Sequence, residues 1–144
     1  MRILAIDYGD RRSGLAFSDI GELLCAKAHT VKHYSDKELM DKLLNEIEEN
    51  DVGKIVLGLP LNMDGSEGER AEKSRALGEA LKEASGLEVV FIDERLTSVQ
   101  AHSILQSCGK RERKHKNTVD AVAASLILNT YLDSRKPGTD SECF

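Results

Sequence analysis

The chain has 144 residues, of which 40% are hydrophobic and 31% charged, and its formal net charge is −5. This length and composition predict one soluble, compact domain and exclude collagen-like, low-complexity and disordered proteins. The excess of acidic side chains argues against a generic DNA-coating protein. It leaves room for a nuclease, because nucleases gather acidic side chains around a metal ion.

Membrane and secretory classes are also disfavoured. No apolar run approaches the roughly 20 residues that span a bilayer, and Asp7 interrupts the apolar start of the chain too early for a secretory signal. Cys25, Cys108 and Cys143 are widely spaced and form no CxxC or Cys/His ligand pattern, so neither a disulfide framework nor a zinc site is predicted. We therefore expect a cytoplasmic protein without a membrane partner.

Three antiparallel strands are predicted at the start of the chain. Residues 1–7 contain a short apolar run that stops at Tyr8-Gly9-Asp10, which is typical of a buried strand followed by a turn. Residues 12–17 resume the strand pattern after this tight connection and complete a hairpin. Residues 23–31 are expected to add a third strand.

Helices and strands then alternate. The predicted order is a helix capped by Ser35 that ends near Asn50, a strand at 54–59, a helix through 71–81 closed by Gly86, and a strand at 87–92. The continuous apolar run at 54–59 is typical of a strand covered on both faces in a parallel sheet. Together these elements predict an α/β fold with a central mixed five-stranded sheet, three antiparallel strands followed by two parallel strands, flanked by helices.

The last third of the chain is expected to contain a short helix through 99–105, a basic loop at 108–116 and a final helix capped by Asn117 or Thr118. Residues 133–144 are polar and predict a flexible tail. The expected organisation is therefore one domain over residues 1–132, followed by this tail.

Acidic side chains occur where such a sheet would bring them together. Asp7 ends the first strand, Asp93 and Glu94 follow a later parallel strand, and Asp120 begins the last helix. Carboxylates gathered in this way suit Mg²⁺ or Mn²⁺ and favour phosphodiester hydrolysis. Taken singly, each has a structural alternative as a turn residue, a helix N-terminal acid or an ion-pair partner of Arg95.

Four motifs, in the same order along nearly the whole chain, resemble the YqgF/RuvX family. They are Asp7-Tyr8-Gly9-x-x-Arg12-x-Gly14-x-Ala16, the stretch Val56 to Glu67, Asp93-Glu94-Arg95-Leu96-Thr97-Ser98, and Lys116 with Asp120-Ala121-x-Ala123-Ala124. The resemblance implies a ribonuclease H-like fold and a metal-dependent nuclease. It also implies a relation to Holliday-junction resolvases and a link to maturation of the 5′ end of 16S ribosomal RNA.

The resemblance places the acids that hold the metal on Asp7, Glu94 and Asp120. Asp93 is the alternative to Glu94, since alternation along the strand sends these two neighbours to opposite faces and the sequence does not say which faces the metal. Basic and polar side chains near these acids are candidate phosphate contacts, although basic runs are often only solvated. The predicted nucleic-acid contacts are Arg12, Asn62, Arg95, Lys110, Arg111, Arg113, Lys114 and Lys116.

Precursor 16S ribosomal RNA is the favoured substrate, and branched DNA cut by a Holliday-junction resolvase is the alternative. Junction resolution would require two active sites, most simply from a two-fold dimer, and the sequence leaves monomer and homodimer open. A non-catalytic nucleic-acid-binding module is a third interpretation. The opening strand and Asp-x-Gly turn also resemble actin-like kinases and ATPases, but those enzymes close two related domains and need a longer chain.

Overall fold

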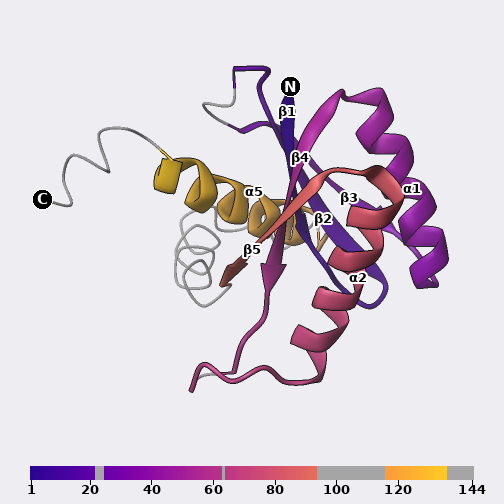
Figure 1. Ribbon diagram of the computed structural model, residues 1–144, viewed down its shortest axis with the longest axis vertical. Helices are drawn as coiled ribbons and strands as arrows, with labels where there is room; N and C mark the ends of the chain where they lie inside the picture. The colour runs from indigo at the N-terminus through magenta and orange to yellow at the C-terminus, as the bar shows by residue number, and fades with distance from the viewer. Residues whose placement is uncertain (22–24, 63, 94–115, 136–144) are drawn as a thin grey trace, which may run out of the picture.

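Five strands form one mixed sheet in the order β3-β2-β1-β4-β5. The computed structural model describes residues 1–21, 25–62, 64–93 and 116–135, and in the last range the side chains of residues 122–134. Figure 1 shows the sheet with its helices. The elements are β1 (Arg2–Asp7), β2 (Arg12–Ser18), β3 (Cys25–Lys32), α1 (Asp36–Glu49), β4 (Val52–Leu59), α2 (Glu69–Ser85), β5 (Glu88–Asp93) and α5 (Lys116–Arg135).

Strand direction follows the predicted pattern. β2 is antiparallel to both β1 and β3, whereas β4 is parallel to β1 and β5 is parallel to β4. The three antiparallel and two parallel strands expected from the sequence are therefore confirmed. Because β1, β4 and β5 run in the same direction, their carboxyl ends lie at one edge of the sheet, which we call the carboxyl edge (Figure 1).

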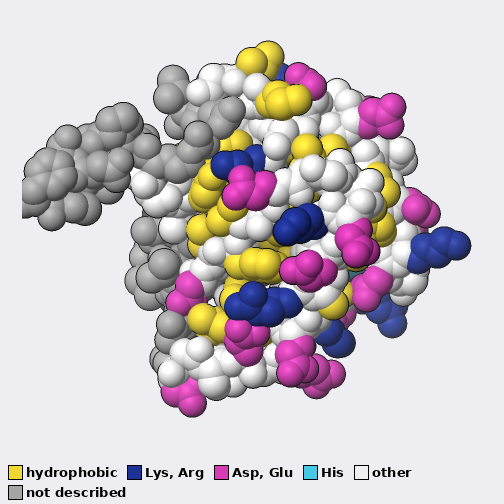
Figure 2. Space-filling model, viewed as in Figure 1, with side chains coloured by type: hydrophobic (Ala, Val, Ile, Leu, Met, Phe, Trp, Pro, Cys, Tyr) yellow, Lys and Arg dark blue, Asp and Glu magenta, His cyan; other side chains and the backbone are white. Residues whose placement is uncertain are grey.

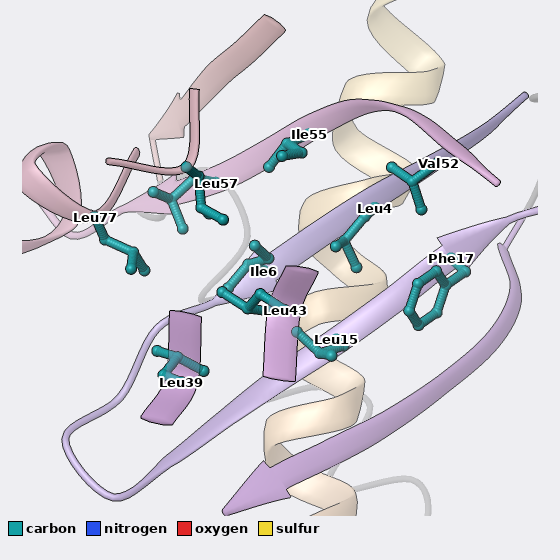
Figure 3. Close-up of a cluster of buried hydrophobic side chains, with 11 residues drawn as sticks. Leu4, Ile6, Leu15, Phe17, Leu39, Leu43, Val52, Ile55, Leu57 and Leu77 are labelled. Carbon is teal, nitrogen blue, oxygen red and sulfur yellow. The ribbon is translucent and has the colours of Figure 1, made fainter. Parts of the chain in front are cut away.

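The sheet carries a separate apolar cluster on each face. On the first, the α1/α2 face, Leu4, Ile6 and Leu57 pack with Leu39 and Leu43 of α1 (Figure 3). On the second, the α5 face, the alternate residues of the same strands pack against α5: Ile3, Ala5, Ala16 and Val56 meet Ala124, Ile127, Leu128, Tyr131 and Leu132. Burying each large aliphatic side chain contributes about 1.5–3 kcal/mol. The alternation also fixes the face of every residue along β1 and β5.

The helix ends confirm the predicted capping residues. Ser35 caps α1 by accepting a hydrogen bond from the backbone N–H of Glu38, and Glu38 accepts one from the N–H of Tyr34. α2 ends at Gly86, whose φ of 75° is the left-handed conformation that favours glycine. Inside α2, Gly78 lies so close to β5 that a Cβ atom there would be 2.7 Å from the ring of Phe91.

α5 differs from its predicted bounds at both ends. It begins at Lys116, so the expected cap at Asn117 or Thr118 is wrong and both residues lie inside the first turn. It continues to Arg135, past the predicted boundary after residue 132, because packing of Tyr131 and Leu132 on the sheet stabilises its last turns. The predicted helix at 99–105 lies outside the described residues. None of the described helices is long and apolar enough to cross a bilayer.

Candidate active site at the carboxyl edge of the sheet

Asp7 is the last residue of β1 and lies at the carboxyl edge, opposite Gly14 of β2. Ile3 and Ala5, which precede it by four and two residues, are buried against α5. Strand alternation therefore puts Asp7 on the α5 face, and its side chain is only half-buried. A carboxylate in this position ends the central strand of the sheet and is accessible to a substrate.

Asp93 is the last residue of β5 and pairs with Leu59 of β4, so it also reaches the carboxyl edge. Asp93 and Asp7 lie on different faces of the sheet. Val89 and Phe91 pack on the α1/α2 face, whereas Val90 and Ile92 pack on the α5 face. Asp93 therefore belongs with Phe91, on the side of the sheet opposite to Asp7.

The remaining predicted acids are described only in part. Glu94 lies outside the described residues, and the backbone of Asp120 is in α5 while its side chain is not described. Position 120 precedes the buried residues Ala124 and Ile127 by four and seven residues, which puts it on the sheet-facing side of the helix. Among the side chains that the structure describes, no group of three or more His, Cys, Asp or Glu residues could hold a metal ion.

The turn that follows Asp7 is fixed by a buried histidine. The backbone N–H of His33 donates to the carbonyl oxygen of Arg11 at 2.9 Å, and its Nε2 is 2.9 Å from Ser13 Oγ. Ser13 Oγ also accepts a hydrogen bond from the N–H of Gly9 at 3.2 Å. Gly9 is required here because a Cβ atom would lie 2.2 Å from the carbonyl oxygen of Arg12. These contacts hold the backbone beside Asp7 in one conformation.

Tyr8 joins the same cluster from the other side of the turn. Its ring stacks on His33 with centroids 6.5 Å apart, and its hydroxyl donates to Asp36 Oδ1 at 2.5 Å. Burial, together with the hydrogen bond to Asp36, raises the pKa of Tyr8 far above its ordinary value, so the hydroxyl stays protonated. The sequence did not reveal the contact between His33 and Ser13, because no local pattern links residues twenty positions apart.

Replacing His33 by glutamine is expected to remove part of the acid sensitivity of the fold. Burial lowers the pKa of His33 below its ordinary 6.5, against the opposing charges of Asp36 and Glu38. The unfolded chain therefore binds a proton that the folded chain does not, so the free energy of unfolding falls as the pH drops below 6.5 toward the lowered pKa. Between about pH 7.5 and about pH 5.5, urea unfolding should show a smaller loss of unfolding free energy for His33→Gln than for wild type. Equal losses in the two proteins would contradict this prediction.

Only some of the predicted nucleic-acid contacts lie among the described residues. Arg12 is half-buried at the start of β2, next to the turn after Asp7. Asn62 is exposed in the loop after β4, where its side chain donates to Ser66 Oγ at 3.0 Å and helps to close the loop on itself. Lys116 begins α5, and its side chain is not described. The others lie outside the described residues: Arg95, Lys110, Arg111, Arg113 and Lys114.

The loop after β4 is also tied to α2. Arg75 donates to both carboxylate oxygens of Glu67, at 2.6 and 2.7 Å, and its guanidinium lies 5.1 Å from the ring centroid of Phe91. Asp64 accepts hydrogen bonds from the N–H and the hydroxyl of Ser66. The loop is thus held at the carboxyl edge by its own contacts. The sequence predicted its place but not Arg75, whose partner is eight residues away.

Comparison with known proteins agrees with this architecture. The model of the RuvX family, described as a Holliday junction resolvase, matches residues 1–134. The chain belongs to the RuvX family. One relative from Endomicrobium trichonymphae, named "Putative pre-16S rRNA nuclease", is 45% identical over 92% of this chain and 95% of its own length. A relative of the same name from Lactococcus lactis subsp. cremoris is 43% identical over 92% of this chain and 94% of its own.

Solved structures share the fold of this RuvX chain at low sequence identity. RuvC of Thermus thermophilus in complex with a Holliday junction substrate matches 95% of this chain and 99% of its own, with a TM-score of 0.59 and 12% identity. The Fowlpox virus resolvase in complex with Holliday junction DNA matches 93% and 98%, with a TM-score of 0.60 and 13% identity. These matches confirm the expected ribonuclease H-like fold.

Proposed function

We propose that this RuvX protein is a divalent-metal-dependent nuclease that hydrolyses phosphodiester bonds in the maturation of the 5′ end of precursor 16S ribosomal RNA. The observation that carries the proposal is Asp7 at the carboxyl edge, on the same face as the helix that holds Asp120. The names of the relatives, at 45% and 43% identity over nearly their full length, support the substrate. Such a substrate also implies a cytoplasmic protein.

The donor set suits a hard cation. Asp7, Asp120 and Glu94 offer carboxylate oxygens, which Mg²⁺ and Mn²⁺ prefer, and neither cysteine nor histidine belongs to the set. We choose Glu94 over Asp93 because period-two alternation along β5 puts Asp93 on the face of the sheet opposite to Asp7. A bound ion of this kind lowers the pKa of water and stabilises charge on phosphate oxygens.

The chain's own residues have separate tasks in this proposal. Asp7, Glu94 and Asp120 would hold the ion, while the turn from Tyr8 to Ser13, fixed by His33, keeps the backbone beside Asp7 in place. Arg12 lies beside this turn, where its guanidinium can bind a phosphate oxygen and orient the strand. Orientation of the substrate against a fixed group supplies a large part of the rate of such reactions.

Cleavage of two end-labelled substrates tests the proposal. Precursor 16S RNA and a four-way DNA junction are incubated with the full chain in Mg²⁺, in Mn²⁺ or in EDTA. Metal-dependent trimming of the RNA alone is the expected result. Symmetric cutting of the junction would instead indicate a resolvase and a two-fold dimer. Binding without cleavage of either substrate would contradict the nuclease and favour a non-catalytic module.

Neutralising the basic run between residues 110 and 116 is expected to weaken nucleic-acid binding and flatten its salt dependence. Each phosphate contact that is lost reduces the slope of log K against log salt by about one. Fluorescence anisotropy across a salt series measures the effect on a variant with glutamine at Lys110, Arg111, Arg113, Lys114 and Lys116. A slope equal to that of wild type would remove this segment from the interface.

A further inference from the structure

A small hollow lies beside the turn that follows Asp7, between that turn and the first turns of α2. It is shallow and open to solvent, with a volume of about 10 Å³, which is room for about one water-sized group. Its lining residues are Tyr8, Gly9 and Asp10 of the turn and Arg70, Lys73 and Ser74 of α2. None of these α2 residues belongs to the metal-binding acids or to the candidate phosphate contacts considered above.

Hydrogen-bond donors line this hollow. Ser74 is only 1% exposed and its side chain lies at the wall of the hollow. A hydroxyl in this position can donate a hydrogen bond to a group that is bound there. Arg70 lines the same hollow and makes no hydrogen bond or ion pair with the described residues.

Lys73 adds a second positive charge. Its ammonium is 4.0 Å from Glu69, and both side chains of that pair are more than half exposed. Such a pair contributes little and does not hold the lysine away from the hollow. Over α2 as a whole, Lys and Arg are interspersed with Asp and Glu rather than forming a broad basic patch (Figure 2). A ligand of this hollow would therefore be selected by its contacts with nearby side chains and not by the electrostatic field of α2 as a whole.

We propose that one phosphate group of the nucleic-acid strand binds at the mouth of this hollow with one oxygen inside it, and that Arg70, Lys73 and the hydroxyl of Ser74 donate to its oxygens. The proposal rests on the nucleic-acid substrate proposed above and adds a contact for it. A guanidinium, an ammonium and a hydroxyl offer a phosphate several donors at one point. Asp10 is the single acid among the lining residues, and its charge opposes the phosphate and limits the affinity.

The position of the hollow fits a strand that also reaches Asp7. Gly9 is two residues after Asp7, so their backbones are at most about 7 Å apart. Nucleic acid in a duplex carries one phosphate per about 3.4 Å of axis on each strand. A strand with its reacting phosphate at Asp7 therefore places a phosphate a few nucleotides away at the hollow, after crossing the edge toward α2. This anchor would fix the direction in which the strand enters.

Binding measured without cleavage tests the site. The full chain is titrated with a short single-stranded RNA in EDTA, with fluorescence anisotropy as the readout, across a salt series. Arg70→Gln should lower the affinity by about tenfold and the salt slope by about one. Ser74→Ala should lower the affinity by about three- to fivefold and leave the slope unchanged, because a neutral donor releases no counterion. Asp10→Asn should raise the affinity.

Lys82→Gln is the matched control, because Lys82 is an exposed cation in the last turn of the same helix. It should match wild type in affinity and slope. The proposal is overturned if wild type does not bind the RNA in EDTA, or if Arg70→Gln behaves like Lys82→Gln. It is also overturned if ADP or inorganic phosphate competes for the Arg70-dependent site at least as well as the RNA, which would make the hollow a small-molecule site.

The two proposals can fail separately. Loss of affinity in Arg70→Gln without any cleavage by wild type would keep the phosphate site and reject the nuclease. Metal-dependent cleavage with unchanged binding by Arg70→Gln would keep the nuclease and reject the phosphate site.

Discussion

Replacing Asp7 by asparagine is expected to abolish metal-dependent cleavage of the RNA while leaving the protein folded. Asparagine has the size of aspartate but lacks its charge, so the ion loses a carboxylate at the end of the central strand. Loss of a single charge-stabilising group at an active site typically costs about 10²–10³-fold in rate, and loss of a metal ligand should cost at least as much. The rate of product formation from end-labelled precursor RNA measures the effect.

The control for this variant is Asp41→Asn. Asp41 is an exposed acid on α1 that does not belong to the acids proposed to hold the metal, and its loss changes the net charge by the same amount. Circular dichroism and thermal unfolding of both variants should resemble wild type, because Asp7 is only half-buried and the apolar clusters are untouched. Cleavage by Asp7→Asn at the wild-type rate would contradict the proposed nuclease, whatever the rate of Asp41→Asn.

Much of the fold could be predicted because its signals are local. The apolar run of β4, the cap at Ser35 and the left-handed glycine at Gly86 each lie within a few residues of the element that they define. Strand direction also follows from the sequence, since a tight turn joins antiparallel strands and a helix joins parallel ones. The start of α5 was missed because polar residues that favour a cap are also tolerated in a first helical turn, and packing decides between them.

The site was predictable only where a motif or a strand end marked it. Asp7 could be found because an acid interrupts an apolar strand directly before a turn. The contact of His33 with Ser13 and the hollow beside Arg70 and Ser74 depend on residues far apart in the chain, which meet only when the elements pack. The sequence did not give the face of Asp93, which follows from the buried neighbours in β5, and Glu94 lies outside the described residues.

Those faces make a pair of adjacent substitutions the sharpest test of the metal site. Glu94→Gln is expected to reduce cleavage by about 10²-fold or more, as removal of a charged group from the site should. Asp93→Asn should keep cleavage within a few-fold of wild type, because Asp93 belongs to the side of Phe91 and not to that of Asp7. Both variants lose one negative charge at adjacent positions. A difference between their cleavage rates therefore depends on which of the two acids belongs to the site and not on net charge.

A second readout separates metal binding from the other causes of inactivity. An ion that binds only the folded protein raises its melting temperature, and the rise grows with the logarithm of the ion concentration divided by its dissociation constant. Added Mn²⁺ should therefore stabilise wild type and Asp93→Asn but have little effect on Glu94→Gln. If instead Asp93→Asn lost cleavage and stabilisation by Mn²⁺ while Glu94→Gln kept both, the choice of Glu94 would be wrong. The alternation of β5 would then break at its last residue, and Asp93 would share the face of Asp7.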